Sequence, residues 1–278
     1  MQLKRKLYYT LPPELRLGVR KAYYLPADIW KTLTGKRHKY EPLKGDIYIG
    51  SGDFIAQGLF HLDLLKKHLD LQPEDSVLDI GSGLGRTAVA LTGFLNAKGK
   101  YEGFDVVEKG VKWCKQKINR DYPNFNFNYV PLKNDLYNRN TLDAQQFVFP
   151  YGNDMFDKVF LFSVFTHMSV EEIDNYLHEI KRVLKPGGLC LSTFLIYSEE
   201  NEDWVANNRD FSFPVKKNGY RLMSDTVKSA NICLQRSYLD DLLRDAELIT
   251  IKTIEGNWKK SDFKEAGNQY QDMLVIKA

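Results

Sequence analysis

One short segment limits the possible folds of this chain more than any other: an apolar run that leads into a glycine-rich turn. Val77-Leu78-Asp79-Ile80 predicts a short buried strand, and Gly81-Ser82-Gly83-Leu84-Gly85 follows it directly. Alternate glycines let a backbone approach a ligand closely and present N–H groups with a helix N-terminus. Because Arg86 stands where the dinucleotide fingerprint GxGxxG needs its third glycine, a nicotinamide cofactor is the weaker interpretation.

Segments with strand and helix patterns alternate along the rest of the chain, which predicts an α/β fold with a parallel sheet. Strands are expected over 76–80, 100–107, 125–130, 156–162, 189–194, 248–254 and 273–276. Helices are expected over 54–70, 87–95, 109–120, 169–184 and 237–246. Asp53, Ser169 (with Glu172) and Ser237 are expected to cap helices, and Lys185-Pro186-Gly187-Gly188 to stop one. The last two strands have no long helix between them, which predicts an antiparallel finish.

Composition points to an ordinary globular protein without a membrane span. The 278 residues are 43% hydrophobic and 27% charged. No run approaches the ~18–20 apolar residues that cross a bilayer, nor is there an apolar run of signal-peptide length, so we expect a cytoplasmic protein. The cysteines (Cys114, Cys190 and Cys233) show no CxxC pairing and no ligand spacing with the five histidines. Neither a disulfide framework nor a metal site is therefore indicated.

Positive charge is concentrated at the start of the chain. Residues 1–50 hold eleven Lys and Arg against four acids, a net charge of +7, whereas the whole chain carries +3. Such a basic segment is suited to bind nucleic acid, anionic lipid or an acidic substrate. The alternative is a solvent-exposed face without a partner. Its tyrosines fit either stacking on RNA bases or amphipathic helices that pack on the domain. These tyrosines are Tyr8, Tyr9, Tyr23 and Tyr24.

A carboxylate stands at the position where a ribose would lie. Asp105 ends the predicted strand that begins at Lys100, and it follows Gly85 by 20 residues. A carboxylate at this point accepts two hydrogen bonds from a ribose diol. The alternative is that Asp105 caps the following helix.

Five ordered landmarks resemble class I S-adenosylmethionine-dependent methyltransferases across roughly residues 46–278. They are the glycine turn, Asp105, the segment Phe156-Asp157-Lys158-Val159, the helix end at 183–188, and Gln271-Asp272-Met273-Leu274-Val275. The resemblance implies a Rossmann-like three-layer αβα sandwich, with a seven-stranded, mostly parallel sheet whose last strand is antiparallel. Residues 1–45 would form a basic helical extension or cap, and 46–278 the methyltransferase domain, with a lid insertion at about 196–235.

The resemblance also implies a cofactor, S-adenosyl-L-methionine, which leaves as S-adenosyl-L-homocysteine. Asp79 would hold its amino end, Gly81, Ser82 and Gly83 would line that end, and Asp105 would bind the ribose. Val106 would pack on the adenine. The adenine amino group would be bound by the Leu132 backbone with Asn134 nearby or, as the less favoured alternative, by Asp135. Phe162, Ser163 and Val164 would flank the sulfonium and methyl group. His167 is either a base that takes a proton from an acceptor hydroxyl or a structural histidine at a helix N-terminus.

The acceptor is less defined by the sequence. A small molecule or a glycan fits an aromatic lid, for which the candidate residues are Phe211, Phe213, Tyr220, Trp258 and Gln271. The alternatives are an RNA or protein methyltransferase that uses the basic segment, a non-catalytic cofactor-binding protein, and an NAD-dependent oxidoreductase. No Asn/Asp-Pro-Pro-Tyr/Phe motif and no Pro-Cys nucleophile is present, which argues against methylation of DNA bases. Nothing in the sequence indicates an oligomeric state.

Overall fold

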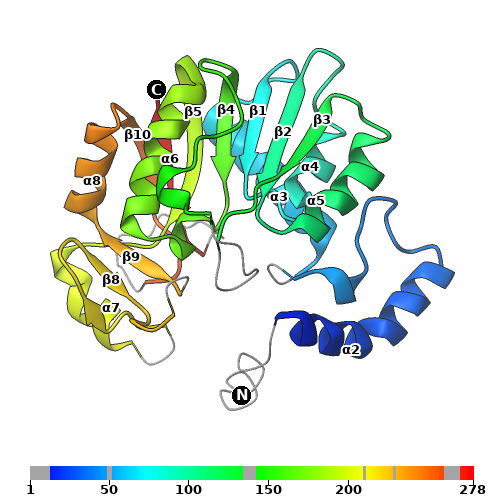
Figure 1. Ribbon diagram of the computed structural model, residues 1–278, viewed down its shortest axis with the longest axis horizontal. Helices are drawn as coiled ribbons and strands as arrows, with labels where there is room; N and C mark the ends of the chain where they lie inside the picture. Colours follow the sequence, from blue (N-terminus) through cyan, green and yellow to red (C-terminus); the bar gives the residue numbers. More distant parts are fainter. Residues whose placement is uncertain (1–12, 49–51, 134–141, 209–210, 228–229, 260–269) are drawn as a thin grey trace.

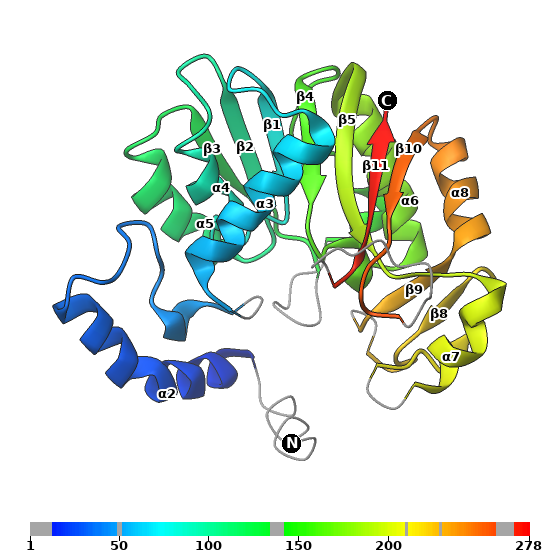
Figure 2. The ribbon, with the colours of Figure 1, turned by 180° about the vertical axis from the view of Figure 1, so that it is seen from behind.

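A central sheet covered on both faces by helices forms the body of the molecule (Figures 1 and 2). The computed structural model describes residues 13–48, 52–133, 142–208, 211–227, 230–259 and 270–278. Across the sheet the strands are β10 (Ile249–Ile254), β11 (Asp272–Lys277), β5 (Leu184–Phe194), β4 (Phe156–Leu161), β1 (Ser76–Ile80), β2 (Lys100–Asp105) and β3 (Phe125–Tyr129). All neighbours pair in parallel except β11, which is antiparallel to both β5 and β10. The predicted seven-stranded sheet with a reversed last strand is therefore confirmed.

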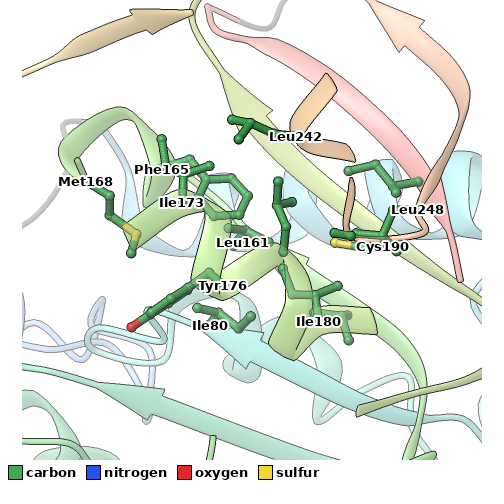
Figure 3. Close-up of a cluster of buried hydrophobic side chains, with 14 of the residues drawn as sticks. Ile80, Leu161, Phe165, Met168, Ile173, Tyr176, Ile180, Cys190, Leu242 and Leu248 are labelled. Atoms are coloured by element: carbon green, nitrogen blue, oxygen red, sulfur yellow. The ribbon is translucent and has the colours of Figure 1, made fainter. Parts of the chain in front are cut away.

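Two hydrophobic cores lie on opposite faces of this sheet. One face carries α6 (Val170–Val183) and α8 (Arg236–Asp245), and the other carries α3 (Phe54–Leu69), α4 (Arg86–Leu91) and α5 (Glu108–Cys114). Figure 3 shows the first core, where Ile173, Tyr176 and Ile180 of α6 meet Ile80 and Leu161 of the strands. The three cysteines are buried and free.

Two predicted helix caps hold, but the cap of the last helix and the lengths of two other helices differ from the prediction. The Asp53 side chain accepts a hydrogen bond from the Ala56 N–H (2.8 Å), and Ser169 forms a capping box with Glu172, so both caps are confirmed. Ser237 is not a cap, because α8 begins at Arg236 and Gln235 occupies the cap position without a side-chain hydrogen bond.

The end of α6 agrees with the prediction, because the helix stops at Val183, just before Lys185-Pro186-Gly187-Gly188. That segment is itself part of β5, which begins at Leu184 rather than at the predicted Leu189. A register shift in the β4–β5 pairing, between Phe156 and Lys158, accommodates the Pro-Gly-Gly segment within the strand. Two other helices are shorter than predicted: α4 stops at Leu91, and α5 passes at Lys115 into a π-helical turn, η2 (Lys115–Asn119).

The insertion after β5 is more regular than the sequence pattern indicated. It contains η5 (Glu199–Asn201), α7 (Glu202–Asn207) and a second, four-stranded sheet in the order β6-β9-β8-β7. Its strands are β6 (Ile196–Tyr197), β9 (Ile232–Gln235), β8 (Tyr220–Leu222) and β7 (Val215–Lys216). Strands of two to four residues are too short to show an alternating pattern, which explains why none was visible.

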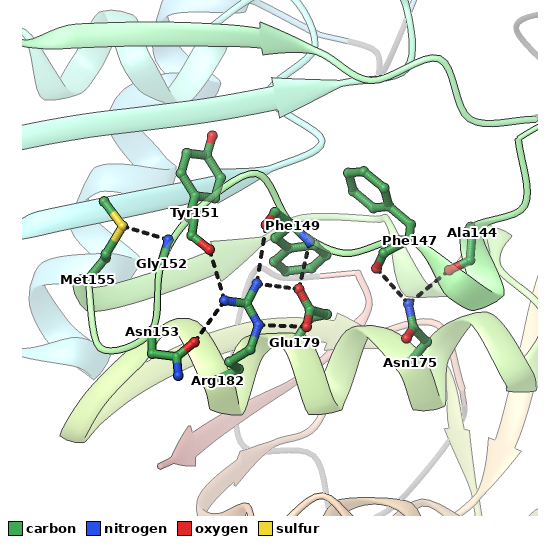
Figure 4. A network of polar contacts seen from close by, with 10 residues as sticks. All are labelled: Ala144, Phe147, Phe149, Tyr151, Gly152, Asn153, Met155, Asn175, Glu179 and Arg182. Atoms are coloured by element: carbon green, nitrogen blue, oxygen red, sulfur yellow. Dashed lines mark hydrogen bonds and ion pairs between the residues drawn. The ribbon is translucent and has the colours of Figure 1, made fainter.

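A polar network holds the loop before β4 against α6 (Figure 4). Arg182 donates to the carbonyl oxygens of Tyr151 (2.8 Å) and Phe149 (3.2 Å), and it forms an ion pair with Glu179. Glu179 in turn accepts from the Phe149 N–H (2.6 Å). The centre of the Phe149 ring lies 5.1 Å from that of Phe104 in β2. The network therefore also holds Phe149 against the carboxyl-terminal part of β2.

The basic segment begins with α2 (Pro13–Leu33), which lies apart from the sandwich in both views (Figures 1 and 2). Asp28 attaches this helix to η1 (Lys44–Asp46) by accepting from the N–H groups of Lys44 (2.7 Å) and Gly45 (3.0 Å). Within the described ranges, no helix combines the length and the apolar character that a membrane crossing needs.

Candidate functional site

The glycine turn lies at the carboxyl end of β1, between β2 and the loop after β4. Gly81, Gly83 and Gly85 have φ angles of 77°, 56° and 71°, in the left-handed region that favours glycine. A Cβ on Gly81 would lie 2.6 Å from Cγ2 of Val164, so the two segments approach closely. The turn is fixed to β2 because Gly81 and Ser82 both donate to the Phe104 carbonyl oxygen (2.9 and 3.0 Å).

Asp105 fastens this turn to the end of β2. Its Oδ2 accepts from the Gly83 N–H and its Oδ1 from the Val107 N–H, both at 2.8 Å. Val107, not Asp105, is the cap residue of α5, so the alternative role as a helix cap is not observed. The Val106 N–H also hydrogen-bonds to this carboxylate and lowers its pKa. Because a carboxylate has about four lone-pair sites, Asp105 can still accept a further hydrogen bond from a ligand.

Asp79 is the second buried carboxylate at this edge. It accepts a hydrogen bond from the Tyr101 hydroxyl (2.7 Å), a partner that the sequence analysis did not identify. Burial raises the pKa of Asp79 to about 7, with a contribution from the Asp105 charge, and it raises the pKa of Asp105 to about 6. In the described part of the chain, no lysine or arginine forms a salt bridge with either carboxylate.

These features fit a polar, positively charged ligand. Two carboxylates buried without a cation are costly, and a ligand that brings an ammonium or a sulfonium offsets that cost. The Ser82 hydroxyl is also buried, and it has no hydrogen-bond partner among the described residues. The residues predicted to hold the amino end and the ribose of S-adenosylmethionine therefore lie together around one turn.

A second polar cluster lies at the carboxyl end of β4. Ser163 has a φ of 59°, which is uncommon for a residue with a side chain. Its N–H donates to the Thr193 hydroxyl (2.7 Å), and its own hydroxyl donates to Oε1 of Gln271 (2.8 Å). Gln271 also donates to the Thr166 hydroxyl (3.5 Å). Ser163, predicted to flank the methyl group, and Gln271, predicted for the acceptor, are thus in direct contact.

Two histidines lie near this end of β4. His167 is half-buried in η4 (Phe165–His167), and its backbone N–H donates to the Val164 carbonyl oxygen (2.9 Å). The ring of His61 in α3 stacks on the Phe162 ring at 3.9 Å, and its Nδ1 lies 2.8 Å from the Thr87 hydroxyl. Burial lowers the pKa of His61 to about 3, so this ring is neutral. No sequence signal distinguished His61 from an ordinary helix residue.

Of the residues predicted for the adenine, Val106 directly follows β2 and Leu132 lies shortly after β3. Val106 is half-buried and packs against the core that contains α6. Leu132 is buried and forms a parallel bridge with Leu142. Asn134 and Asp135 lie outside the described residues.

The aromatic residues predicted for the acceptor mainly form the core of the insertion. Phe213 and Trp258 are buried together with Leu195, Val205 and Cys233. Trp258 donates from Nε1 to Oδ2 of Asp272 (2.7 Å). Packing accounts for the position of Phe213, and packing together with the hydrogen bond to Asp272 accounts for that of Trp258.

The other two aromatic candidates keep some exposure. Phe211 is half-buried and lies edge-to-face against Trp258 and Tyr270. Tyr220 is half-buried beside Tyr238 and packs against the core that contains α6.

Asp272 joins the insertion to the main sheet. It is fully buried at the start of β11 and accepts from the N–H groups of Ile196 and Gly256, both at 2.8 Å, as well as from Trp258. The Lys259 ammonium lies 3.4 Å from its Oδ1 and donates to the Ile196 carbonyl oxygen (2.9 Å). Burial raises the pKa of Asp272, while the Lys259 charge opposes that rise.

Comparisons with known proteins agree with this arrangement. Residues 78–192 match a family model described as a methyltransferase domain. A ubiquinone/menaquinone biosynthesis C-methyltransferase from Wigglesworthia glossinidia brevipalpis is 29% identical over 43% of this chain and 42% of its own length. A phosphoethanolamine N-methyltransferase from Plasmodium falciparum is 26% identical over 66% of this chain and 60% of its own. This chain thus spans about half the length of these curated relatives.

A solved structure supports the fold. The PH0226 protein from Pyrococcus horikoshii OT3 superposes with a TM-score of 0.54 at 17% identity, over 83% of this chain and 93% of that chain. At this level of identity the similarity concerns the fold alone.

Proposed function

Because this chain belongs to the class I S-adenosylmethionine-dependent methyltransferases, we propose that it transfers a methyl group from S-adenosylmethionine to a small-molecule or glycan acceptor. The observation that carries the proposal is the pair of buried carboxylates, Asp79 and Asp105, on either side of the glycine turn. The names of the relatives, which concern quinone biosynthesis and phosphoethanolamine, support a small acceptor. With a methyltransferase domain matched, the oxidoreductase alternative has no support.

The chain's own residues bind and orient the donor. Asp105 accepts hydrogen bonds from the ribose diol with the lone pairs that Gly83 and Val107 leave available. Asp79, held by Tyr101, provides negative charge for the amino end, and Ser82 provides a buried hydroxyl. When bound, S-adenosylmethionine supplies a methyl group already activated by the sulfonium.

Positioning and the exclusion of water then account for most of the catalysis. In-line attack on an activated methyl needs the acceptor atom at near-attack distance and little else. Ser163 and Gln271, fixed to each other and to Thr193 and Thr166, are suited to orient a polar acceptor. For a hydroxyl acceptor, His167 is our candidate to receive the proton.

A release assay tests this function. The purified chain is incubated with S-adenosylmethionine and each of three acceptor classes: phosphoethanolamine, a demethylated quinol and a uridine oligonucleotide. We expect acceptor-dependent formation of S-adenosylhomocysteine with a small molecule, and its loss in Asp105→Ala. The matched control is Asp241→Ala, which changes an exposed carboxylate on α8. Turnover with the oligonucleotide alone would replace the small-molecule proposal with RNA methylation.

A further inference from the structure

The helix α2 turns its polar side toward the protein and its apolar side outward. Toward the body, Asp28 is buried against η1, Lys21 pairs with Asp46 (3.0 Å) and Lys31 pairs with Glu41 (2.6 Å). An ordinary surface helix does the reverse, because its apolar stripe faces the core. This inversion leaves the hydrophobic side of α2 without a partner in the described structure.

The outward side is a continuous apolar stripe. Its residues recur at spacings of three and four, which place them on one face of a helix. They are Leu15, Val19, Ala22, Pro26, Ile29 and Leu33, with Tyr23, Leu25 and Trp30 beside them. Ile29 is 49% exposed, Trp30 58% and Leu33 82%. A continuous row of exposed apolar side chains along one helix marks an interaction surface.

Charge identifies the kind of partner. Residues 1–50 carry a net charge of +7, and their described acids are already held: Asp28 by backbone N–H groups, Glu41 by Lys31, and Asp46 by Lys21 and Lys109. At the end of the stripe, the Lys36 ammonium lies 4.7 Å from the centre of the Trp30 ring. Lys21, Lys31 and Lys39 are each paired with an acid. Lys36 forms no salt bridge with a described residue, so the end of the apolar stripe carries a positive charge that no described acid cancels.

We propose that α2 docks on the surface of an anionic lipid bilayer, lying in the interface with its apolar stripe buried among the acyl chains. Apolar residues on one side and Lys or Arg beside them are the features of such interfacial helices. A second copy of this chain would bring a like charge of +7 to the contact. RNA would meet an apolar stripe whose hydrogen-bond donors are confined to Tyr23 and Trp30 at its edge.

The placement of α2 gives this docking a consequence. In both views α2 lies beyond the carboxyl ends of the parallel strands, on the side of the molecule that also carries the insertion (Figures 1 and 2). Asp79, Asp105 and Ser163 belong to that same end of the sheet. The bound bilayer would therefore lie on the side of the candidate site. The docking itself does not depend on methyl transfer.

Vesicle sedimentation with the full chain tests the docking. The vesicles are phosphatidylcholine alone or phosphatidylcholine with about 30 mol% phosphatidylglycerol, at about 0.1 M salt so that charge effects are not screened out. We expect the chain to sediment with the anionic vesicles, and less so as salt is raised. The double variant Ile29→Glu/Leu33→Glu should bind at least about tenfold more weakly, because it places two charges in the buried stripe.

The matched control is Ile249→Glu/Ile251→Glu, which introduces the same two charges at other exposed residues, 67% and 54% exposed on β10. It should bind vesicles like the unchanged protein. All variants are compared by thermal unfolding, and an unchanged midpoint shows that the fold is kept. The proposal is overturned if the protein does not sediment with anionic vesicles, or if the double variant sediments equally well. A dimer that the double variant dissociates, or retention of a uridine oligonucleotide, in each case without vesicle binding, overturns it as well.

Discussion

Two regions of the molecule bury carboxylates, and they treat them in opposite ways. At the start of β11, Asp272 is surrounded by two backbone N–H groups, the Trp258 indole and the Lys259 ammonium. At the ends of β1 and β2, Asp79 and Asp105 share the same degree of burial without a cation from the described residues. Burial alone therefore does not distinguish a structural acid from a binding acid.

What distinguishes them is how far their hydrogen-bonding and charge requirements are met. A carboxylate with a full set of partners stabilises the fold and has little left for a ligand. A carboxylate that keeps free lone pairs and lacks a counter-ion costs stability until a ligand binds. On this view Asp272 holds the insertion in place, whereas Asp79 and Asp105 are available for the donor.

The largest expected effect belongs to Asp272. Asp272→Ala removes three hydrogen bonds and leaves the buried Lys259 with Glu255 as its one charged partner among the described residues, so the free energy of unfolding should fall by about 3 kcal/mol. Urea unfolding followed by tryptophan fluorescence measures this. Asp241→Ala, at an exposed ion pair, should change it by less than about 1 kcal/mol. Equal effects of the two changes would contradict the structural role of Asp272.

The next effect concerns binding rather than stability. Asp105→Ala should weaken S-adenosylhomocysteine binding by about 1–3 kcal/mol, because it removes charge-assisted hydrogen bonds to the ribose. Isothermal titration calorimetry measures the change against Asp241→Ala as control. Unchanged affinity would remove Asp105 from the site.

Replacing Asp79 should raise the stability of the unliganded chain at high pH and weaken its binding of the ligand. The pKa of Asp79 is about 7 in the folded chain, against an ordinary 3.8. Protonation of Asp79 therefore stabilises the folded chain fully below about pH 4, and this stabilisation is lost as the pH rises to about 7. Asp79→Asn cannot ionise, and at pH 8 the unliganded variant should be more stable by about 1–2 kcal/mol while binding S-adenosylhomocysteine more weakly. Thermal unfolding at pH 5 and pH 8 tests the sign. A variant that is less stable than the unchanged chain at pH 8 would show that Asp79 is a structural acid like Asp272.

His167 carries the smallest prediction. His167→Ala should leave the affinity for S-adenosylhomocysteine nearly unchanged and slow turnover on a hydroxyl acceptor by about tenfold, or 1.4 kcal/mol in the barrier. Initial rates with saturating donor measure this. Turnover equal to that of the unchanged chain would return His167 to a structural role at η4.

The parts of this account that could be predicted from sequence are local. The glycine turn and Asp105 lie within one strand–helix–strand unit, so the spacing along the chain predicted their contact, and the structure shows the Gly83 N–H on Asp105. The alternation of strands and helices likewise predicted a parallel sheet, and the lack of a long helix between the last two strands predicted the antiparallel end. The helix caps at Asp53 and Ser169 needed only four consecutive residues each.

The parts that could not be predicted depend on contacts between distant segments. Ser163 and Gln271 are 108 positions apart, and Ile196 and Asp272 are 76 apart. No spacing rule places such residues together, and the hydrogen bond between Trp258 and Asp272 could not be predicted from the sequence either. The periodicity of α2 shows an apolar side, but only the structure shows that this side faces outward.

Calorimetric titration of the purified chain with S-adenosylhomocysteine, and with NAD as control, tests the central claim that the Asp79–Asp105 edge is a binding site for the methyl donor. The account predicts micromolar binding of S-adenosylhomocysteine, none of NAD, and a large loss in Asp105→Ala but not in Asp241→Ala. Binding of NAD, or S-adenosylhomocysteine affinity that Asp105→Ala leaves intact, would contradict it.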